Sequence, residues 1–383
     1  MKIAITARTA FTPLDAIEDA VVMVEDGRIV SVGNRSAVEI PSGAHFIDLG
    51  DSILAPGFIE IHIHGGAGHD LMDLNREGLA RFERHLTNYG VTSYCPTTVT
   101  APLDVTYKAL SWLTEAKSFG RDRSRAKPLG LHLEGPFLSH AKRGVHPPEN
   151  LVEPSPERFE KFWQAAQGNV AMITIAPELP GAVETIKVAA SRNVCVSLGH
   201  SNATLAETKG GIEAGGRHAT HTFNAMRTLD HREPGILGEV LYNDNVSADI
   251  IADGVHVHPE MVSLFLRAKG RDKAVLITDA LSATGMGDGK FRLGGFEIEV
   301  NGDRCTANGV LAGSVLTLDR AVQNVRKFAN WPLQHAIQLA TLNPARALGH
   351  QDVGVIAPGA KADLVVLNAA GEVQRTIVGE FIE

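Results

Sequence analysis

The feature that most constrains the fold of this chain is a series of short apolar runs, each leading into a histidine or an acid. The runs are residues 57–64, 129–134, 194–198, 217–220 and 274–279. The residues that close or follow them are His62, His64, Glu134, His200, His221 and Asp279. In a barrel of parallel strands the active site lies at the carboxyl ends of the strands. Side chains that are far apart in the sequence, each ending a different strand, would therefore meet at one place.

Segments with helical periodicity separate these runs, for example residues 76–89, 103–118, 157–167 and 259–269. Strands that alternate with helices indicate βαβ units and a parallel sheet. Three more apolar runs, at residues 92–95, 171–176 and 247–252, bring the number of strand–helix units to about eight. The pattern predicts the α/β class and a (β/α)8 TIM barrel over residues 56–355, and the histidines and acids at its strand ends indicate that the barrel is metal-dependent.

Both ends of the chain favour β structure instead. Residues 20–24 and 29–32 are apolar and flank Asp26-Gly27, a strong hairpin signal. Near the other end, residues 364–367 and 374–378 form two more short runs. These segments predict one small β-sandwich domain built from both chain termini, with residues 1–55 plus 356–383.

Composition restricts the class of protein. A hydrophobic content of 44% with 38 glycines is typical of a globular α/β enzyme. A net charge of -8 argues against nucleic acid as a partner, and no apolar run is long enough to cross a membrane. Cys95, Cys195 and Cys305 are widely spaced, without a CxxC pair, which suits a reducing compartment. We therefore expect a cytoplasmic protein.

The pair His62 and His64 is the strongest local signal. Side chains two apart project from the same face of a strand, so both imidazoles can reach one ion. Gly65 and Gly66 follow the pair and would let backbone approach a ligand closely. The alternative interpretation is a pair of surface histidines with no function.

The other candidates are weaker when each is taken alone. Glu134 could be an ordinary strand-terminating acid, His200 and His221 could be buried core histidines, and Asp279 could cap a turn. Together they make coincidence improbable, because imidazole and carboxylate are what a catalytic zinc or iron site requires. Asp279 would then transfer a proton between the attacking water and a leaving amine.

Three residues outside the strand ends could serve a substrate. His146 follows Glu134 by twelve residues and could polarise a carbonyl group, and His256 follows another predicted strand. Arg232 could hold an anion through its planar guanidinium. For each of the three, a position on the solvated surface is an equally good interpretation.

In its motifs and in their order along the chain, this sequence resembles the N-acetylglucosamine-6-phosphate deacetylases of the amidohydrolase superfamily. The matching segments are residues 56–59, 133–136 (Leu133-Glu134-Gly135-Pro136), 199–204, 221–226, 232–235, 251–254, 278–280, 311–314 and 340–345. They span nearly the whole chain, and although each is short, the set is highly specific.

The resemblance implies a reaction and a set of roles. The reaction is the removal of acetate from N-acetyl-D-glucosamine 6-phosphate to give D-glucosamine 6-phosphate, in amino-sugar catabolism and cell-wall sugar recycling. Glu134, His200 and His221 would hold the main metal, Asp279 would be the acid/base, and His146 would contact the amide oxygen. The residues implied to hold the sugar phosphate are Asn224, Ala225, Arg232, His256, Leu311, Ala312, Gly313 and Ser314.

Several alternatives stay open at this point. Some family members carry glutamine and asparagine where this chain has His62 and His64, so one or two divalent ions, zinc or iron(II), could bind. The family suggests a homodimer, in which Arg232 could act in its own subunit or in the partner. The substrate could be N-acetylgalactosamine 6-phosphate instead.

Two other classes of protein are less well supported. Dihydroorotase-like cyclic-amide hydrolases usually bridge two metals with a modified lysine, but the matching strand here ends in Glu134 and no predicted strand ends in lysine. An inactive barrel that acts as an assembly partner should have lost a ligand or the proton-transfer residue. His62, His64, Glu134, His200, His221 and Asp279 are all present.

Overall fold

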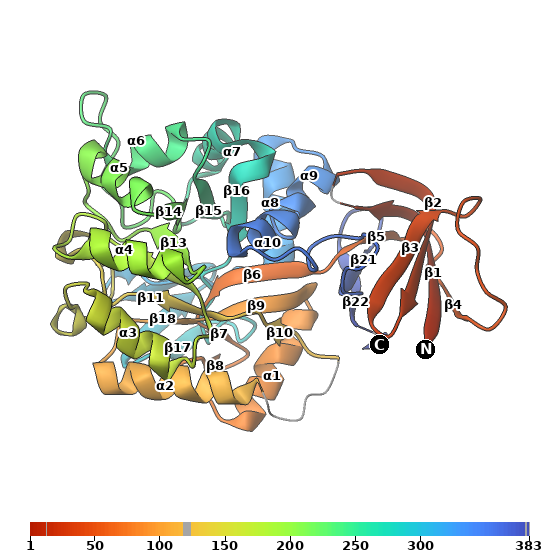
Figure 1. Ribbon diagram of the computed structural model, residues 1–383, viewed down its shortest axis with the longest axis horizontal. Coiled ribbons are helices and arrows are strands. Elements are labelled where there is room, and N and C mark those ends of the chain that lie inside the picture. Colours follow the sequence, from red (N-terminus) through yellow and green to blue (C-terminus); the bar gives the residue numbers. More distant parts are fainter. Residues whose placement is uncertain (13, 118–123, 380, 383) are drawn as a thin grey trace.

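The computed structural model describes residues 1–12, 14–117, 124–379 and 381–382. Figure 1 shows a barrel of strands and helices beside a smaller sheet, which lies at the right of the view together with both marked ends of the chain. No described helix combines the length and the apolar composition that crossing a bilayer requires.

The barrel is built from a nine-stranded parallel sheet, of which β10 (Lys127–Pro128) is a short extra strand beside β9. The remaining strands are β6 (Phe58–Ile63), β9 (Val91–Thr98), β11 (Leu131–Glu134), β12 (Val170–Ile175), β13 (Cys195–Leu198), β14 (Gly216–Ala219), β15 (Ser247–Ile251) and β16 (Ala274–Ile277). Almost every residue in them is buried, as expected for parallel strands covered on both faces.

The first and last strands close the barrel. The amide of Asp279 donates to the carbonyl of His62 at 3.0 Å, and the amide of His64 donates to the carbonyl of Ala280 at 2.9 Å. The closure therefore lies beside residues predicted to bind metal. The predicted (β/α)8 barrel is confirmed.

Helices cover the barrel between successive strands. They are α1 (Arg76–Thr87), α2 (Leu103–Ala116), α3 (Pro156–Ala165), α4 (Ala182–Ser191), α5 (Leu205–Glu213), α6 (Gly235–Tyr242) and α7 (Pro259–Lys273), and α8 (Leu318–Ala329), α9 (Leu333–Gln338) and α10 (Leu342–Leu348) follow the last strand. Local sequence fixes several starts: Asn75 and Ser155 cap α1 and α3, and Thr204 and Glu207 form a capping box at α5.

The smaller sheet combines strands from both ends of the chain. Its strands are β1 (Lys2–Phe11), β2 (Ala16–Glu25), β3 (Arg28–Asn34), β4 (His45–Asp48), β5 (Ile53–Pro56), β21 (Leu364–Leu367), β22 (Val373–Val378) and β23 (Phe381–Ile382). Asp26 and Gly27 form the predicted tight turn, both with positive φ. Ile3 and Val24 from one end pack in the same core as Leu364 and Ile377 from the other. The exact limits of this domain stay a prediction.

A second small sheet is inserted between β16 and α8. It consists of the antiparallel strands β17 (Gly289–Leu293), β18 (Phe296–Asn301), β19 (Arg304–Ala307) and β20 (Val310–Leu311). Ile298, Val300 and Cys305 give it a core of its own, which it shares with Val99 and Leu281 beside the barrel mouth. This insertion carries residues 311–313 to the site.

Candidate functional site

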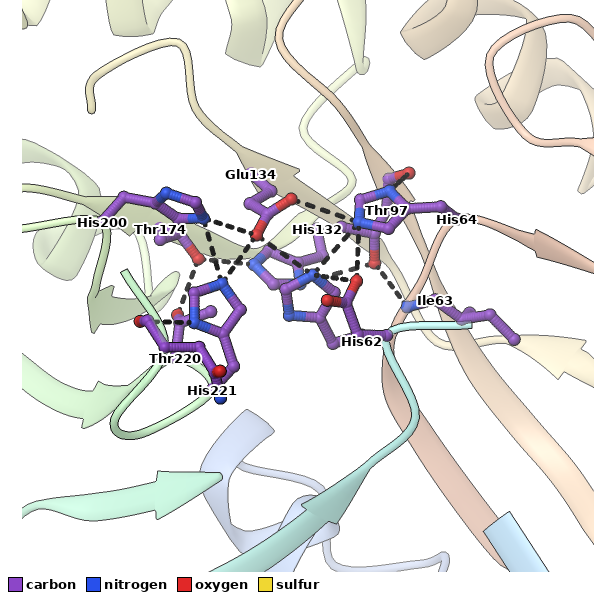
Figure 2. Close-up of polar contacts among 12 residues, drawn as sticks. His62, Ile63, His64, Thr97, His132, Glu134, Thr174, His200, Thr220 and His221 are labelled. Atoms are coloured by element: carbon purple, nitrogen blue, oxygen red, sulfur yellow. Dashed lines mark hydrogen bonds and ion pairs between the residues drawn. The ribbon is translucent and has the colours of Figure 1, made fainter. Parts of the chain in front are cut away.

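The predicted ligands converge at the carboxyl end of the barrel strands (Figure 2). Two groups of three side chains offer atoms within 4.8 Å of one another: His62, His64 and Asp279 in the first cluster, and Glu134, His200 and His221 in the second cluster. All six are buried. Five different strands bring them together, as the sequence predicted.

Glu134 lies between the two clusters. Its Oε1 is 3.1 Å from Nε2 of His200 and 3.0 Å from Nε2 of His221, and it is 3.3 Å from Nε2 of His62. Its Oε2 is 3.1 Å from Nε2 of His64. A carboxylate placed in this way can bridge two ions, one held by each cluster.

Asp279 completes the first cluster from the other side. Its Oδ1 is 3.2 Å from Nε2 of His64 and 3.6 Å from Nε2 of His62. The same oxygen can therefore face an ion held by these imidazoles or a water molecule beside it.

The hydrogen bonds of the imidazoles show that the site fits a cation. Nδ1 of His64, His200 and His221 lies 3.2, 2.9 and 3.2 Å from the backbone carbonyls of Thr97, Lys142 and Asn224. A carbonyl only accepts, so each Nδ1 carries a hydrogen, and Nε2 is the nitrogen that each ring turns toward the site as a possible metal ligand. Nε2 of His200 and His221 are only 3.0 Å apart, an arrangement of lone pairs that a positive ion between them would stabilise.

His146 has the opposite arrangement. Its Nδ1 accepts from the backbone amide of Thr100 at 3.3 Å and contacts the Thr100 hydroxyl at 2.8 Å. Its hydrogen therefore lies on Nε2, which is 3.5 Å from Oε2 of Glu134 and faces the site. His146 is therefore a hydrogen-bond donor toward the cavity, whereas His64, His200 and His221 carry a hydrogen on the nitrogen that points away from it.

The charges of the site support the same conclusion. Burial opposes ionisation of Glu134, but the surrounding imidazoles, His62 first among them, hold the pKa of Glu134 well below its usual range. The pKa of Asp279 is lowered in the same way, chiefly through its hydrogen bond to His64 and against the effect of burial. Burial and the neighbouring imidazoles lower the pKa of His200 to about 4. Against the effect of burial, hydrogen bonds to Asp279 and Glu134 raise the pKa of His64 to about 10, and a hydrogen bond to Glu134 raises the pKa of His221 to about 9. Two ionised carboxylates among imidazoles, whose Nε2 protons a cation would replace, are a suitable set for a divalent ion.

The backbone is strained where three of these side chains leave their strands. His200, His221 and Asp279 have φ values of 47°, 31° and 52°, in the left-handed region that non-glycine residues rarely adopt. Such conformations cost about 1–3 kcal/mol each and persist where surrounding contacts hold them. They turn the side chains from the strand direction toward the centre of the barrel mouth.

The two clusters open into a cavity of about 240 Å³. Most of the predicted site residues line it: His64, Glu134, His146, His200, His221, Asn224, Ala225, His256, Asp279, Leu311, Ala312 and Gly313. His62 is fully buried directly behind His64. Ser314 is buried outside the lining, where its hydroxyl donates to the carbonyl of Thr278 at 2.6 Å.

Arg232 also lies outside the cavity lining. It is exposed in the loop before α6, and its backbone amide donates to Asp230. The described residues that line the cavity include no lysine and no arginine. A phosphate in this cavity would therefore need a cation from outside the described wall.

Two residues of the wall present polar groups to a ligand. Nδ2 of Asn224 is buried without a hydrogen-bond partner. Nδ1 of His256 is held by Asp253 at 2.7 Å, which orients the ring. Both groups suit the recognition of a polar ligand such as a sugar.

Sequence reasoning missed several buried groups behind the ligands. Glu60 accepts the amides of His62 and Thr278 at 2.9 and 3.0 Å, and so ties β6 to β16. Asp249 accepts the amide of His221 and is held by Nε2 of His218 at 2.9 Å. The signal was available: strand alternation places Glu60 on the interior face together with His62, where an acid is unexpected.

Comparison with known proteins agrees with the geometry. Residues 53–380 match the model of the amidohydrolase family. The chain is 36% identical over 366 residues to an N-acetylglucosamine-6-phosphate deacetylase from Vibrio furnissii, covering 94% of this chain and 90% of the relative. It is 37% identical over 371 residues to an N-acetylgalactosamine-6-phosphate deacetylase from Escherichia coli, covering 96% of both.

Solved structures lead to the same family. A mutant N-acetyl-D-glucosamine-6-phosphate deacetylase from Mycobacterium smegmatis, in complex with N-acetyl-D-glucosamine-6-phosphate, has a TM-score of 0.92 and 33% identity, covering 100% of this chain and 99% of the other. The chain therefore belongs to the amidohydrolase family, and within it is similar to the N-acetylglucosamine-6-phosphate deacetylases.

Proposed function

We propose that the protein hydrolyses the acetamide of N-acetyl-D-glucosamine 6-phosphate to D-glucosamine 6-phosphate and acetate. The observation that carries the proposal is the convergence of both clusters in one cavity, with imidazole Nε2 atoms facing two carboxylates whose pKa values are lowered. The deacetylases named above, which match this chain over nearly its whole length, support the substrate.

His62, His64 and Asp279 would hold one divalent ion, and Glu134, His200 and His221 the other, with Glu134 shared. A zinc or iron(II) ion supplies the electrophilic part of the chemistry, because it lowers the pKa of water to roughly 7 and polarises a carbonyl group. The presence of two clusters favours two ions for each subunit.

Asp279 is proposed as the acid/base. Its ionised carboxylate would accept a proton from the attacking water and pass that proton to the nitrogen that leaves as an amine. The position of Oδ1, 3.2 Å from Nε2 of His64, puts it beside the first cluster, where the water would be activated.

His146 is proposed to stabilise the oxygen of the acetamide. Its Nε2 carries hydrogen, because Thr100 occupies Nδ1, and donors aimed at a developing oxyanion contribute strongly to catalysis. Asn224 and His256 would hold the sugar from the opposite part of the wall, together with the backbone of Ala225 and of residues 311–313.

The phosphate would be held by Arg232 of a second copy of the chain. Arg232 is exposed and lies outside the cavity of its own subunit, and the described residues of the cavity wall include no lysine or arginine. A guanidinium pairs with two phosphate oxygens at once. This role makes the active unit a homodimer.

The proposed setting is the reducing cytoplasm. Cys95, Cys195 and Cys305 are free and buried, which suits a compartment in which disulfides do not form. The partner that the site favours is a small sugar phosphate.

Acetate release from a panel of N-acetylated sugars tests the function. We expect metal-loaded protein to act on N-acetylglucosamine 6-phosphate with a much higher kcat/KM than on unphosphorylated N-acetylglucosamine. Chelator-treated protein should be inactive and should recover when zinc or iron(II) is restored. Equal kcat/KM with and without the phosphate, or activity without metal, would contradict the proposal.

N-acetylgalactosamine 6-phosphate is the second candidate substrate. The relative from Escherichia coli that bears this specificity is 37% identical to the chain. The two sugars differ at one hydroxyl group, so the same panel should contain both 6-phosphates. A higher kcat/KM for the galactosamine derivative would reassign the substrate and leave the reaction unchanged.

A further inference from the structure

A fully buried histidine that is not a ligand lies beneath the two clusters. His132 is on β11, two residues before Glu134, and has 0% exposure. Its Nδ1 is 3.0 Å from the carbonyl of Ile61 on β6. Because a carbonyl only accepts, Nδ1 carries the hydrogen and Nε2 must accept.

This tautomer fixes the direction of a chain of hydrogen bonds. Nε2 of His132 is 2.8 Å from the hydroxyl of Thr174, which must therefore donate to it. The Thr174 oxygen then accepts from Thr220 at 2.8 Å, and the Thr220 oxygen accepts from Ser197 at 2.5 Å. All three hydroxyl residues are fully buried. We call Ser197, Thr220, Thr174 and His132 the polar floor.

The polar floor links the strands that carry the ligands. Ser197 is on β13, which leads to His200, and Thr220 immediately precedes His221. The series of hydrogen bonds ends at the carbonyl of Ile61, which immediately precedes His62 on β6. Figure 2 shows His132 beside His62, with Thr174 close to His200 and Thr220 close to His221. The floor therefore spans the space from one cluster to the other.

His62 depends on this floor in a way that the other imidazoles do not. His64, His200 and His221 are each held by a backbone carbonyl at Nδ1, whereas Nδ1 of His62 is buried without a partner. The ring of His62 packs closest to His132, with the ring centroids 4.6 Å apart and the planes at 78°, whereas the centroids of the other two contacting imidazoles, His64 and His221, are 5.2 and 5.6 Å away. His132 thus supplies the orientation that a hydrogen bond supplies elsewhere.

We propose that His132 is a positioning residue, held by the polar floor, which orients His62 and fixes the first cluster relative to the second. The inference rests on the proposed function as a metal-dependent hydrolase and deepens it. It assigns no ligand role to His132, because both of its ring nitrogens are already occupied by Ile61 and Thr174.

The consequence is specific to the first cluster. Loss of the Thr174 hydroxyl leaves Nε2 of His132 buried without a donor, and the ring is then free to turn away from His62. Changes of groups behind metal ligands typically reduce metal affinity by about 10–100-fold. The second cluster keeps its own carbonyl anchors and should be affected much less.

The test compares Thr174→Val with Thr174→Ser, since valine keeps the shape and serine keeps the hydroxyl. Cobalt(II) or zinc(II) is titrated into metal-free protein, and bound equivalents and dissociation constants are measured without substrate. We expect Thr174→Val to raise the dissociation constant of the ion bound at the first cluster on the order of 10-fold. Thr174→Ser should bind both equivalents like the wild type.

To show which cluster has lost metal affinity, Thr174→Val is repeated in the His62→Gln/His64→Asn double variant. That double variant retains only the second cluster, so the substitution should change affinity little there. Thr185→Val on α4, which removes a buried hydroxyl that donates to the carbonyl of Gly181, is the control for loss of a buried hydrogen bond. It should leave both dissociation constants unchanged.

Two outcomes would overturn the inference. One is an unchanged first-cluster affinity in Thr174→Val, and the other is an equal loss of affinity in Thr174→Val and Thr185→Val. If Thr174→Val does not fold, Ser197→Ala removes the hydroxyl at the far end of the polar floor and is judged by the same criteria. Protein that binds metal as expected but releases no acetate contradicts the proposed function and leaves this inference intact.

Discussion

At the scale of single residues, the strongest test concerns Asp279. Asp279→Asn keeps the shape of the side chain but cannot take up a proton from water. We expect acetate release to fall by about 10²–10⁴-fold, the usual contribution of general acid–base catalysis. Metal content, measured by elemental analysis, should stay close to that of the wild type, because His62, His64 and Glu134 remain.

Asp303→Asn is the matched control for this change. Asp303 is half exposed on the inserted sheet, where it pairs with Arg320 at 2.8 Å, and it lies outside the cavity lining. The turnover of Asp303→Asn should equal that of the wild type. Wild-type turnover in metal-loaded Asp279→Asn would rule out Asp279 as the acid/base.

The number of metal ions is decided by His62 and His64. In the His62→Gln/His64→Asn double variant only the second cluster keeps its full set of side chains. We expect elemental analysis to give two ions for each wild-type chain and one for the variant. An unchanged count, or loss of all metal, is incompatible with one ion in each cluster.

Individual site residues were predictable to different degrees. His62, His64, Glu134, His200, His221 and Asp279 meet as predicted, because barrel geometry brings strand ends together and the residue types show the chemistry. His132, Asp249 and Glu60 were not assigned, because each is held in part by a backbone group of another segment, at Ile61, His221 and Thr278 respectively. No pattern in one strand shows which carbonyl or amide another strand will present.

At the scale of elements, the barrel followed from periodicity and the inserted sheet did not. The helical segments predicted to begin at residues 76, 103 and 259 begin there as α1, α2 and α7. The insertion was missed, although residues 296–301 alternate clearly and Asn301-Gly302-Asp303 is a turn signal. The glycines before it favoured a loop, and the apolar side chains of this sheet form a core separate from the barrel.

One pair of helices has a predictable dependence on pH. Lys269, near the end of α7, donates to the carbonyls of Val240 and Asn243 at the end of α6, both at 2.8 Å. Burial lowers the pKa of Lys269 from 10.5 to about 8. Between these two values the unfolded chain binds more protons than the folded chain, so the contribution of Lys269 to stability rises with pH.

Chemical denaturation of the wild type and of Lys269→Met measures this contribution. The difference in unfolding free energy, wild type minus variant, should increase as the pH is raised from about 8 to about 10.5. Lys209→Met serves as the control for loss of a positive charge, because Lys209 is exposed on α5. A difference that is constant over this range would show that Lys269 titrates normally.

At the scale of the whole molecule, the question is which subunit supplies Arg232. Arg232→Ala and Asp279→Asn each remove a different part of the proposed site. If Arg232 acts across a dimer, a hybrid of the two variants contains one site with Asp279 and with the partner's Arg232 intact. We expect mixing and reassociation of the two weakly active variants to restore acetate release at low substrate concentration.

The same experiment has a clear contrary result. If Arg232 acts in its own subunit, each site of the hybrid still lacks one residue, and mixing restores nothing. Arg232→Ala alone should raise KM for the phosphorylated sugar and leave the metal content unchanged. Mixing Arg232→Ala with wild type under the same conditions controls for the exchange of subunits.

The sheet built from both ends of the chain has a consequence for synthesis on the ribosome. Strand β5 ends at Pro56 and pairs with β21, which begins at Leu364. At about 5–20 residues per second, the 307 residues between these positions take roughly 15–60 s to make. During that interval the edge of β5 that later pairs with β21 has no partner. The small sheet is therefore completed only after the barrel has been translated. Nascent chains arrested before residue 360 should be cut by protease within the first 55 residues, whereas chains extended past residue 382 should resist cleavage.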